Sequence, residues 1–184
     1  AWEDRTPDES LTPAAFENAI AVHMSLGGST NAIIHVIAMA RRAGVAVSLE
    51  TFDQIGRKVP VIANLRPSGQ YLMEDFFYAG GLPALMKVLG DKLHGSPTTV
   101  NGRTPADNIA DAKVYNDDVI RPLEKAIYAE GATAVLKGNL APRGCVMKPS
   151  AAEPRLRKHR GPALVFRDYN HMAKEIERLD LDVT

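Results

Sequence analysis

The sequence predicts an α/β fold in two parts: the end of an N-terminal α/β domain over residues 1–118, then the first strands of a C-terminal β-barrel-like domain over residues 119–184. Helical apolar patterns alternate with short strand-like runs through the first part. After the polar stretch that ends in Arg121-Pro122, the periodicity becomes strand-like. An apolar share of 45% in 184 residues is normal for a globular chain that buries a core.

The first part opens with two predicted helices. Thr12-Pro13 supplies an N-cap and a proline at the first helical position, so a helix should run from Pro13 to about Ser25. Gly27-Gly28 ends it, because glycine favours the left-handed conformation found after a helix. A second helix is expected over residues 31–43. It is apolar on nearly every side, which predicts that it is buried in something large.

Shorter elements should complete the first part. Composition marks residues 66–69 as a turn, and Asn101-Gly102 supplies the two positive-φ residues of a type I′ hairpin turn within residues 98–104. The other expected elements are a short strand from Val45, a helix over 51–58, a strand over 59–63, helices over 71–79 and 83–89, and a short helix capped by Thr104.

The second part is predicted to hold short strands separated by glycine and proline turns. Strands are expected over residues 133–137, 145–148 and 163–166. An amphipathic helix should follow over residues 169–179. Three strands are too few to close a barrel, so these should be its beginning.

Composition and charge exclude several classes of protein. Acidic and basic residues balance at 22 each, so no net field attracts the chain to nucleic acid or to an anionic membrane. The longest apolar run, 32–40, contains His35 and is shorter than the roughly 20 residues of a membrane-spanning helix. One cysteine, Cys145, suits a soluble protein of the reducing cytoplasm. The start at Ala1-Trp2, with no initiator methionine, indicates an internal piece of a longer protein.

The segment Gly27-Gly28-Ser29-Thr30-Asn31 is the motif best suited to a ligand. It places small hydrogen-bonding side chains at a helix N-terminus, where free backbone N–H groups and the helix dipole favour an anion such as a carboxylate. Ser29, Thr30 and Asn31 are therefore the candidate contacts to an acid substrate. From the motif alone, the favoured interpretation is that Ser29 or Thr30 only caps the helix while the glycines let the chain turn.

Other residues of chemical interest have structural interpretations. His23 and His35 lie on predicted helices among apolar neighbours, where a histidine is typically packed or capping. Glu74 and Asp75 are adjacent, so on a helix they point about 100° apart and suit helix-start charge better than paired acid–base chemistry. Cys145 lies between a glycine and two apolar residues, which predicts a small buried side chain in a strand.

Six segments carry further information when they are taken in order. They are Ala15–Ile20, Leu26–Ala32, Phe52–Gly56, Pro67–Asp75, Gly80–Ala84 and Leu136–Pro142. Their order and their amino-acid sequences resemble those of the dihydroxy-acid and 6-phosphogluconate dehydratase family over almost the whole chain. Within that family, Asp75–Gly81, Tyr115–Pro122 and Lys158–Ala163 look more like the pentonate and hexonate dehydratases than the branched-chain amino-acid enzyme.

The resemblance implies an enzyme that converts a 2,3-dihydroxy acid into a 2-keto-3-deoxy acid with a [2Fe–2S] cluster and Mg²⁺. Iron would act as a Lewis acid on the departing C3 hydroxyl, while Mg²⁺ would hold the carboxylate and the C2 oxygen as a serine removes the C2 proton. The family's cluster cysteines, most magnesium carboxylates and a carbamylated lysine lie upstream of the matched part. A magnesium glutamate and the serine base lie downstream. The resemblance thus assigns no catalytic or metal-binding residue to this chain.

Three functions remain open from the sequence. The chain is predicted to be an inactive fragment of a homo-oligomeric hydro-lyase that dehydrates a sugar acid, an aldonate. The first alternative is the dihydroxy-acid dehydratase of branched-chain amino-acid biosynthesis. The second is a scaffold or interaction domain without the metals, because fold and family likeness do not by themselves fix an activity.

Overall fold

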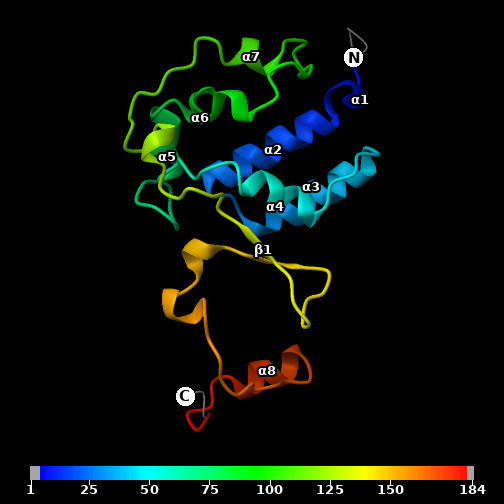
Figure 1. Ribbon diagram of the computed structural model, residues 1–184, viewed down its shortest axis with the longest axis vertical. Helices are drawn as coiled ribbons and strands as arrows, with labels where there is room; N and C mark the ends of the chain where they lie inside the picture. Colours follow the sequence, from blue (N-terminus) through cyan, green and yellow to red (C-terminus); the bar gives the residue numbers. More distant parts are fainter. Residues whose placement is uncertain (1–4, 182–184) are drawn as a thin grey trace. The chain divides into compact units, whose positions relative to one another are not determined.

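The computed structural model describes residues 5–181, so the expectation drawn from Ala1-Trp2 lies outside the described residues. Helices and one two-stranded antiparallel sheet make up its regular structure, which agrees with an α/β domain followed by the start of a second domain. Two compact units divide between Ala151 and Ala152 (Figure 1). The domain boundary at residue 118 stays a prediction. Within residues 5–181, no helix has the length and apolar character needed to span a membrane.

The long helices of the first unit begin where local signals predict. A short helix, α1 (Pro7–Ser10), comes first. In α2 (Pro13–Leu26), the Thr12 side chain accepts a hydrogen bond from the Ala15 N–H at 3.3 Å. α3 (Thr30–Arg42) has Ser29 as its N-cap and two arginines in its last turn, where the helix dipole favours cations. The predicted helices over 13–25 and 31–43 are confirmed.

The remaining elements of the first unit are short. They are α4 (Leu49–Gly56), α5 (Met73–Tyr78), α6 (Gly81–Leu89), α7 (Pro105–Asn108), and the 3-10 turns η1 (Gly90–Lys92), η2 (Leu123–Lys125) and η3 (Pro149–Ala151). Thr104 caps α7 as predicted, since its hydroxyl accepts from the Asp107 N–H at 3.1 Å. The expected hairpin at 98–104 is a turn without flanking strands, closed by a 2.8 Å bond from the Gly102 N–H to the Thr99 C=O.

The core of the first unit lies between α2, α4, α6 and the extended segment 59–65. Burying one large aliphatic or aromatic side chain stabilises the fold by about 1.5–3 kcal/mol. The largest buried side chains are Phe52, Ile20, Met24, Ile33, Ile62, Leu85, Leu89 and Ile120.

Segment 59–65 is buried, yet it forms no continuous strand. It makes single bridges, from Val61 to Tyr128 and from Ala63 to Ile120. The N–H groups of Ile62 and Ala63 instead donate to the C=O of Ser25 at the end of α2, at 3.1 and 3.3 Å. The prediction of a regular strand over 59–63 is therefore wrong, because a helix end takes the hydrogen bonds that a neighbouring strand would need.

The strand expected from Val45 is also absent. The Val45 N–H donates to the Ala40 C=O at 2.8 Å, so this residue closes the end of α3. Residues 45–48 then lead directly into α4. The apolar residues here pack beside a helix instead of entering a sheet, a distinction that a short apolar run cannot make by itself.

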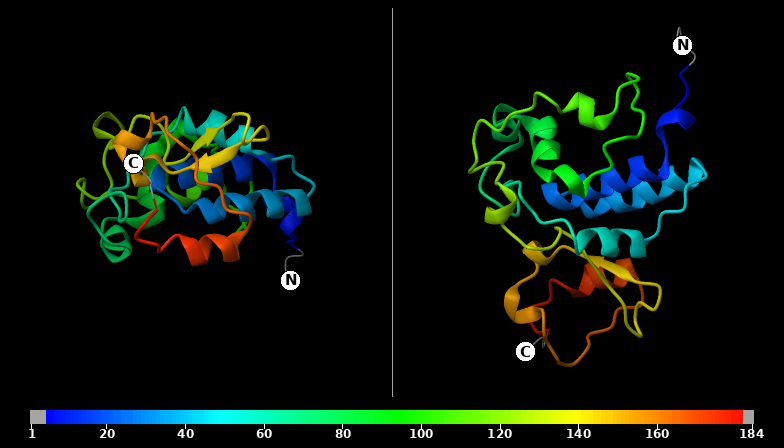
Figure 2. Two further views of the ribbon diagram at one scale, coloured as in Figure 1. Left: turned by 90° about the horizontal axis from the view of Figure 1, so that it is seen from below. Right: turned by 45° about the horizontal axis from the view of Figure 1, so that its top comes forward.

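A β-hairpin lies near the end of the first unit. β1 (Ala134–Leu136) pairs antiparallel with β2 (Cys145–Met147), and Val135 lies opposite Val146. β1 packs against α4, as both views of Figure 2 show. Alternate residues of a strand point to opposite faces of the hairpin. Leu136 and Cys145 therefore lie on one face, and Val135 and Val146 lie on the other. Cys145 is exposed, and the prediction that it is buried is wrong.

The second unit contains η4 (Pro154–Leu156) and α8 (Tyr169–Glu175). Asp168 caps α8 by accepting a hydrogen bond from the His171 N–H at 2.8 Å. The helix is shorter than the 169–179 predicted. The strand expected over 163–166 is absent from the described residues, because a strand needs a pairing partner and this short unit supplies none.

Apolar surface remains on α3. Only Ile33 and Ala40 of this helix are buried, while Ile34 is 69% and Met39 is 54% exposed. The sequence led us to expect that this helix is buried. Within residues 5–181, no large part of the protein covers its exposed face.

We expect the isolated chain to associate in solution. The exposed face of α3 and the open edges of a two-stranded hairpin both favour contact with other molecules. Size-exclusion chromatography over a range of concentrations should show a concentration-dependent shift, which Ile34→Lys with Met39→Glu should reduce. A monomer at all concentrations with a sharp cooperative melt would contradict the expectation.

Candidate functional site

The glycine loop, defined as residues 27–29, joins the end of α2 to the start of α3. Gly27 has a φ of +79°, the left-handed conformation that glycine adopts without strain. The N–H groups of Gly27 and Gly28 both donate to the His23 C=O, at 3.0 Å for Gly28. Ser29 is extended and begins α3. The loop is thus a hydrogen-bonded junction between two helices.

Ser29, Thr30 and Asn31 lie side by side at the N-terminus of α3, and all three are exposed. Ser29 Oγ accepts a hydrogen bond from the Asn31 N–H at 3.2 Å, which confirms Ser29 as the cap. Its hydroxyl hydrogen is still available to donate, because an alcohol can accept and donate at once. The role of these residues as substrate contacts stays a prediction.

The side chain of Lys148, the residue directly after β2, contacts the glycine loop. Its Nζ donates to the Gly27 C=O at 2.7 Å and lies 3.5 Å from the Gly28 C=O. Burial of the side chain lowers the pKa of Lys148. Sequence reasoning missed this residue. The two partners are 121 positions apart, so no local pattern signals their contact.

His23 packs beneath the loop, as predicted. Its ring meets Phe52 edge-on, with 6.2 Å between the ring centroids. A Cβ on Gly28 would overlap the imidazole, so only glycine fits there without displacing the ring. Burial, and secondly the charge of Lys148, lower the pKa of His23, so the ring is neutral at pH 7. His35, by contrast, is exposed on α3, and its expected packing is wrong because that face of the helix is uncovered.

A pocket of about 360 Å³ lies between the glycine loop and the segment that leads to α5. Ser29, Arg66 and Tyr71 are among its lining residues. Arg66 Nε donates to the Gln70 C=O at 3.0 Å, which orients the guanidinium. A guanidinium and a serine hydroxyl beside a helix N-cap are groups that bind carboxylates. Thr30 and Asn31 are not among the residues that line this pocket. Arg66 has no sequence signal beyond its place beside a proline turn.

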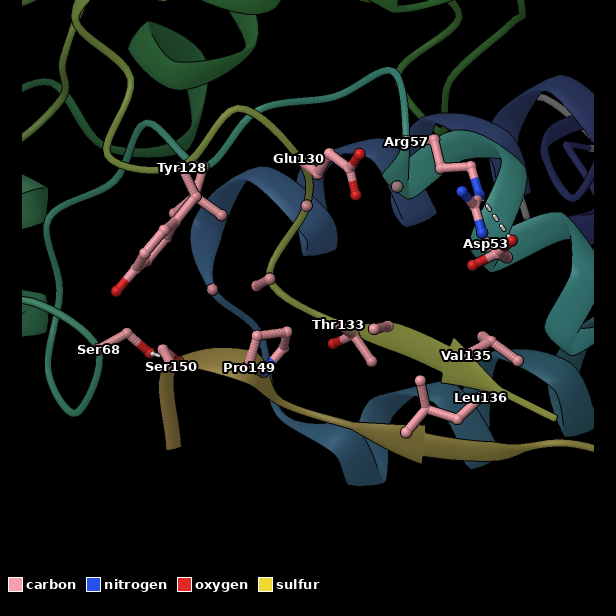
Figure 3. A pocket seen from close by; sticks show the side chains of 16 residues that line it. Asp53, Arg57, Ser68, Tyr128, Glu130, Thr133, Val135, Leu136, Pro149 and Ser150 are labelled. Carbon is pink, nitrogen blue, oxygen red and sulfur yellow. Dashed lines mark hydrogen bonds and ion pairs between the residues drawn. The ribbon is translucent and has the colours of Figure 1, made fainter. Parts of the chain in front are cut away.

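A second pocket, of about 290 Å³, also touches Gly27 (Figure 3). Ser68 Oγ and Ser150 Oγ lie 2.7 Å apart at its edge. Arg57 Nε donates to Asp53 Oδ2 at 2.8 Å, so this cation is already paired with a carboxylate. Apart from this ion pair, the second pocket is lined by apolar groups, hydroxyls and the carboxylate of Glu130, and it therefore suits an acid less well than the pocket that contains Arg66.

The adjacent carboxylates serve the start of a helix, as predicted. Glu74 and Asp75 lie in the first turn of α5. Asp75 Oδ2 accepts a hydrogen bond from the Leu72 N–H at 2.7 Å. This bond satisfies one of the backbone donors that a helix start leaves free.

The described residues do not fit a metal cofactor. Among residues 5–181, no group of three His, Cys, Asp or Glu side chains is placed to hold a metal ion. A [2Fe–2S] cluster takes roughly four protein ligands, commonly cysteines, whereas the sequence contains one cysteine and Cys145 is exposed. We therefore assign no chemical step in this chain to a cluster or to Mg²⁺.

Comparison with protein families accounts for nearly the whole chain. The model described as dihydroxy-acid/6-phosphogluconate dehydratase N-terminal matches residues 1–108, and its C-terminal counterpart matches residues 118–183. The chain belongs to the dihydroxy-acid/6-phosphogluconate dehydratase family. The resemblance drawn from the sequence is thereby confirmed, and the glycine loop and both pockets are features of a dehydratase-family chain.

Individual relatives of this dehydratase-family chain include enzymes named for different acids. An L-arabinonate dehydratase of Rhizobium leguminosarum bv. trifolii is 50% identical over 98% of the chain and 32% of its own length. A 6-deoxy-6-sulfo-D-gluconate dehydratase of Pseudomonas putida is 48% identical over 100% of the chain and 32% of its own length. A dihydroxy-acid dehydratase of Ignicoccus hospitalis is 48% identical over 89% of the chain and 30% of its own length. The chain spans about a third of the length of these relatives.

Proposed function

We propose that this chain is part of a hydro-lyase that removes water from an aldonate and yields a 2-keto-3-deoxy acid. The identity to the arabinonate and sulfogluconate dehydratases along almost the entire chain supports an aldonate as the substrate. In the overall reaction the C2–H and C3–OH bonds break, water leaves, and the resulting enol becomes the 2-keto acid.

The chain's contribution is to hold the acid end of the substrate. The observation that supports this role is the pocket in which Ser29, at the N-terminus of α3, lies with Arg66. Thr30 and Asn31 extend the same polar helix start. Free N–H groups, hydroxyls and a guanidinium bind a carboxylate without participating in the chemistry.

The rest of the proposed protein supplies the parts that this chain lacks. A [2Fe–2S] cluster and Mg²⁺ are bound by residues outside it, and the intact protein works as a cytoplasmic homo-oligomer. Residues 1–118 form the end of the N-terminal domain and residues 119–184 start the C-terminal domain. The proposed partner is a small hydroxy-acid substrate; nucleic acid and membranes have no part in the function.

A branched 2,3-dihydroxy acid is the second candidate substrate. The Ignicoccus hospitalis dihydroxy-acid dehydratase matches nearly as well in identity, over a smaller share of the chain. The two substrates share the reacting 2,3-diol and the carboxylate, and they differ in the polarity of what lies beyond C3. Hydroxyl groups there make hydrogen bonds that methyl groups cannot replace.

Kinetics of the full-length protein test the choice. We expect kcat/KM for L-arabinonate or D-gluconate to exceed that for 2,3-dihydroxyisovalerate by at least about 100-fold, because a site built to bind substrate hydroxyls leaves its polar groups unpaired with an apolar analogue. The keto-acid product is measured in both cases. A preference for the branched substrate would favour the second candidate, and no turnover of either would overturn the hydro-lyase proposal.

A further inference from the structure

The ammonium group of Lys148 lies against the backbone carbonyls of two consecutive glycines in the loop between α2 and α3. Lys148 Nζ donates to the Gly27 C=O at 2.7 Å and lies 3.5 Å from the Gly28 C=O. Gly27 is the residue that terminates α2, and Gly28 directly precedes the cap of α3. Carbonyls at a helix C-terminus lack intrahelical partners and carry partial negative charge, so a cation there is favourable.

The ring of His23, which packs against the loop, does not provide this contact. A Cβ atom at position 28 would overlap the His23 ring, so another residue at this position would displace the ring. His23 Nε2 is buried and has no hydrogen-bond partner among the described residues, so it donates nothing to the loop carbonyls. The charged donor that contacts the loop carbonyls in the described structure is Lys148.

The hairpin that carries Lys148 is attached independently of this contact. β1 packs against α4, and Val146 of β2 packs against the core cluster. Lys137 Nζ, in the loop after β1, lies 2.7 Å from Glu50 Oε2 on α4. The hairpin can thus stay in place when the Lys148 amine is removed, and the amine's effect on the glycine loop can be measured separately.

We infer that Lys148 is a positioning residue, which fixes the glycine loop and thereby the N-terminus of α3 with Ser29, Thr30 and Asn31. Lys148 links a strand of the sequence's second part to a helix start in its first part. Its effect on turnover rests on the proposed function of that helix start. The contact of Lys148 with the loop carbonyls does not depend on that proposed function.

Hydrogen exchange and kinetics of the full-length protein test this inference together. Lys148→Met keeps the length of the side chain and removes the donor. We expect amide exchange in peptides covering residues 26–33 to accelerate at least about tenfold, which corresponds to about 1.4 kcal/mol. KM for the aldonate should rise at least about fivefold with a smaller change in kcat, because ground-state binding is affected more than the chemical step.

Three comparison variants separate local positioning from general damage. Lys148→Arg retains a charged donor and should restore most of the exchange protection. Lys148→Leu also removes the donor and tests the same contact if the methionine variant does not fold. Lys92→Met is the matched control, since Lys92 Nζ also donates to one backbone carbonyl, that of Lys58 at 2.8 Å, far along the chain from the glycine loop. It should leave exchange at 26–33 unchanged.

The exchange measurement decides the inference. Unchanged exchange over residues 26–33 in Lys148→Met or Lys148→Leu would overturn it, whatever the kinetics. Equal acceleration throughout the protein would overturn it too, because the lysine would then support the fold in general. Faster local exchange with wild-type kinetics would leave the hold on the loop established, and the proposed substrate role of the loop would be the part that fails.

Discussion

The isolated 184-residue chain should bind no stoichiometric [2Fe–2S] cluster and turn over no sugar acid. One thiol cannot supply the roughly four ligands that such a cluster takes, and Cys145 is the only cysteine in the sequence. The residues described by the structure also contain no group of acidic, histidine and cysteine side chains placed to hold a metal ion. Activity should therefore fall below detection, a larger loss than any single substitution predicted above would cause.

Anaerobic reconstitution with iron and sulfide provides the measurement. After desalting, iron and acid-labile sulfide should be far below one cluster per chain, and visible absorption should be absent. Cys145→Ser is the control, and it should behave like the unmodified chain because a single thiol cannot hold a cluster. Stoichiometric iron and sulfide that disappear in Cys145→Ser would show instead that chains share a cluster through this residue.

The sequence predicted the helices well because their signals are local. Thr12-Pro13 begins α2 and Gly27 ends it, Ser29 caps α3, and Thr104 caps α7. Each of these signals acts through hydrogen bonds or backbone conformation within about four residues. The first two strands predicted for the second part, around Val135 and Val146, were also found, since they pair as a hairpin close in the sequence.

Failures occurred where the outcome depends on distant residues. Ile62 and Ala63 form no strand because their N–H groups meet the end of α2, and Cys145 is exposed because its face of the hairpin is uncovered. The candidate site divides in the same way. Ser29 was predicted from its own neighbourhood, whereas Arg66 and Lys148 come to the glycine loop from other parts of the chain. Helix periodicity and turn composition contain no information about such contacts.

Replacing the polar side chains at the start of α3 should weaken catalysis by the full-length protein. We expect Ser29→Ala, Thr30→Ala and Asn31→Ala each to raise KM or lower kcat/KM for the aldonate at least about tenfold, equivalent to about 1.4 kcal/mol of lost transition-state stabilisation. The reason is that each variant removes a group that the proposal places beside the substrate carboxylate. Steady-state kinetics and thermal melts of the same preparations provide the measurement.

The structure makes Thr30 and Asn31 the sharper tests. Ser29 accepts the capping bond from the Asn31 N–H, so Ser29→Ala should also cost about 1 kcal/mol of stability through loss of the cap. Ser29→Asn retains a capping acceptor without the hydroxyl, and it should restore the melting temperature without restoring KM. Thr12→Ala removes the equivalent cap of α2, where the Ala15 N–H donates to Thr12 Oγ1, and should lower the melting temperature at wild-type KM.

The pattern across these variants distinguishes a ligand site from a structural junction. If the start of α3 only terminates a turn, Ser29→Ala will resemble Thr12→Ala, and Thr30→Ala and Asn31→Ala will have wild-type kinetics. If it binds the acid, Thr30→Ala and Asn31→Ala will lose affinity at a normal melting temperature, because both side chains are exposed in the described structure. Their loss then removes contacts to the substrate and leaves the folded protein's own contacts intact.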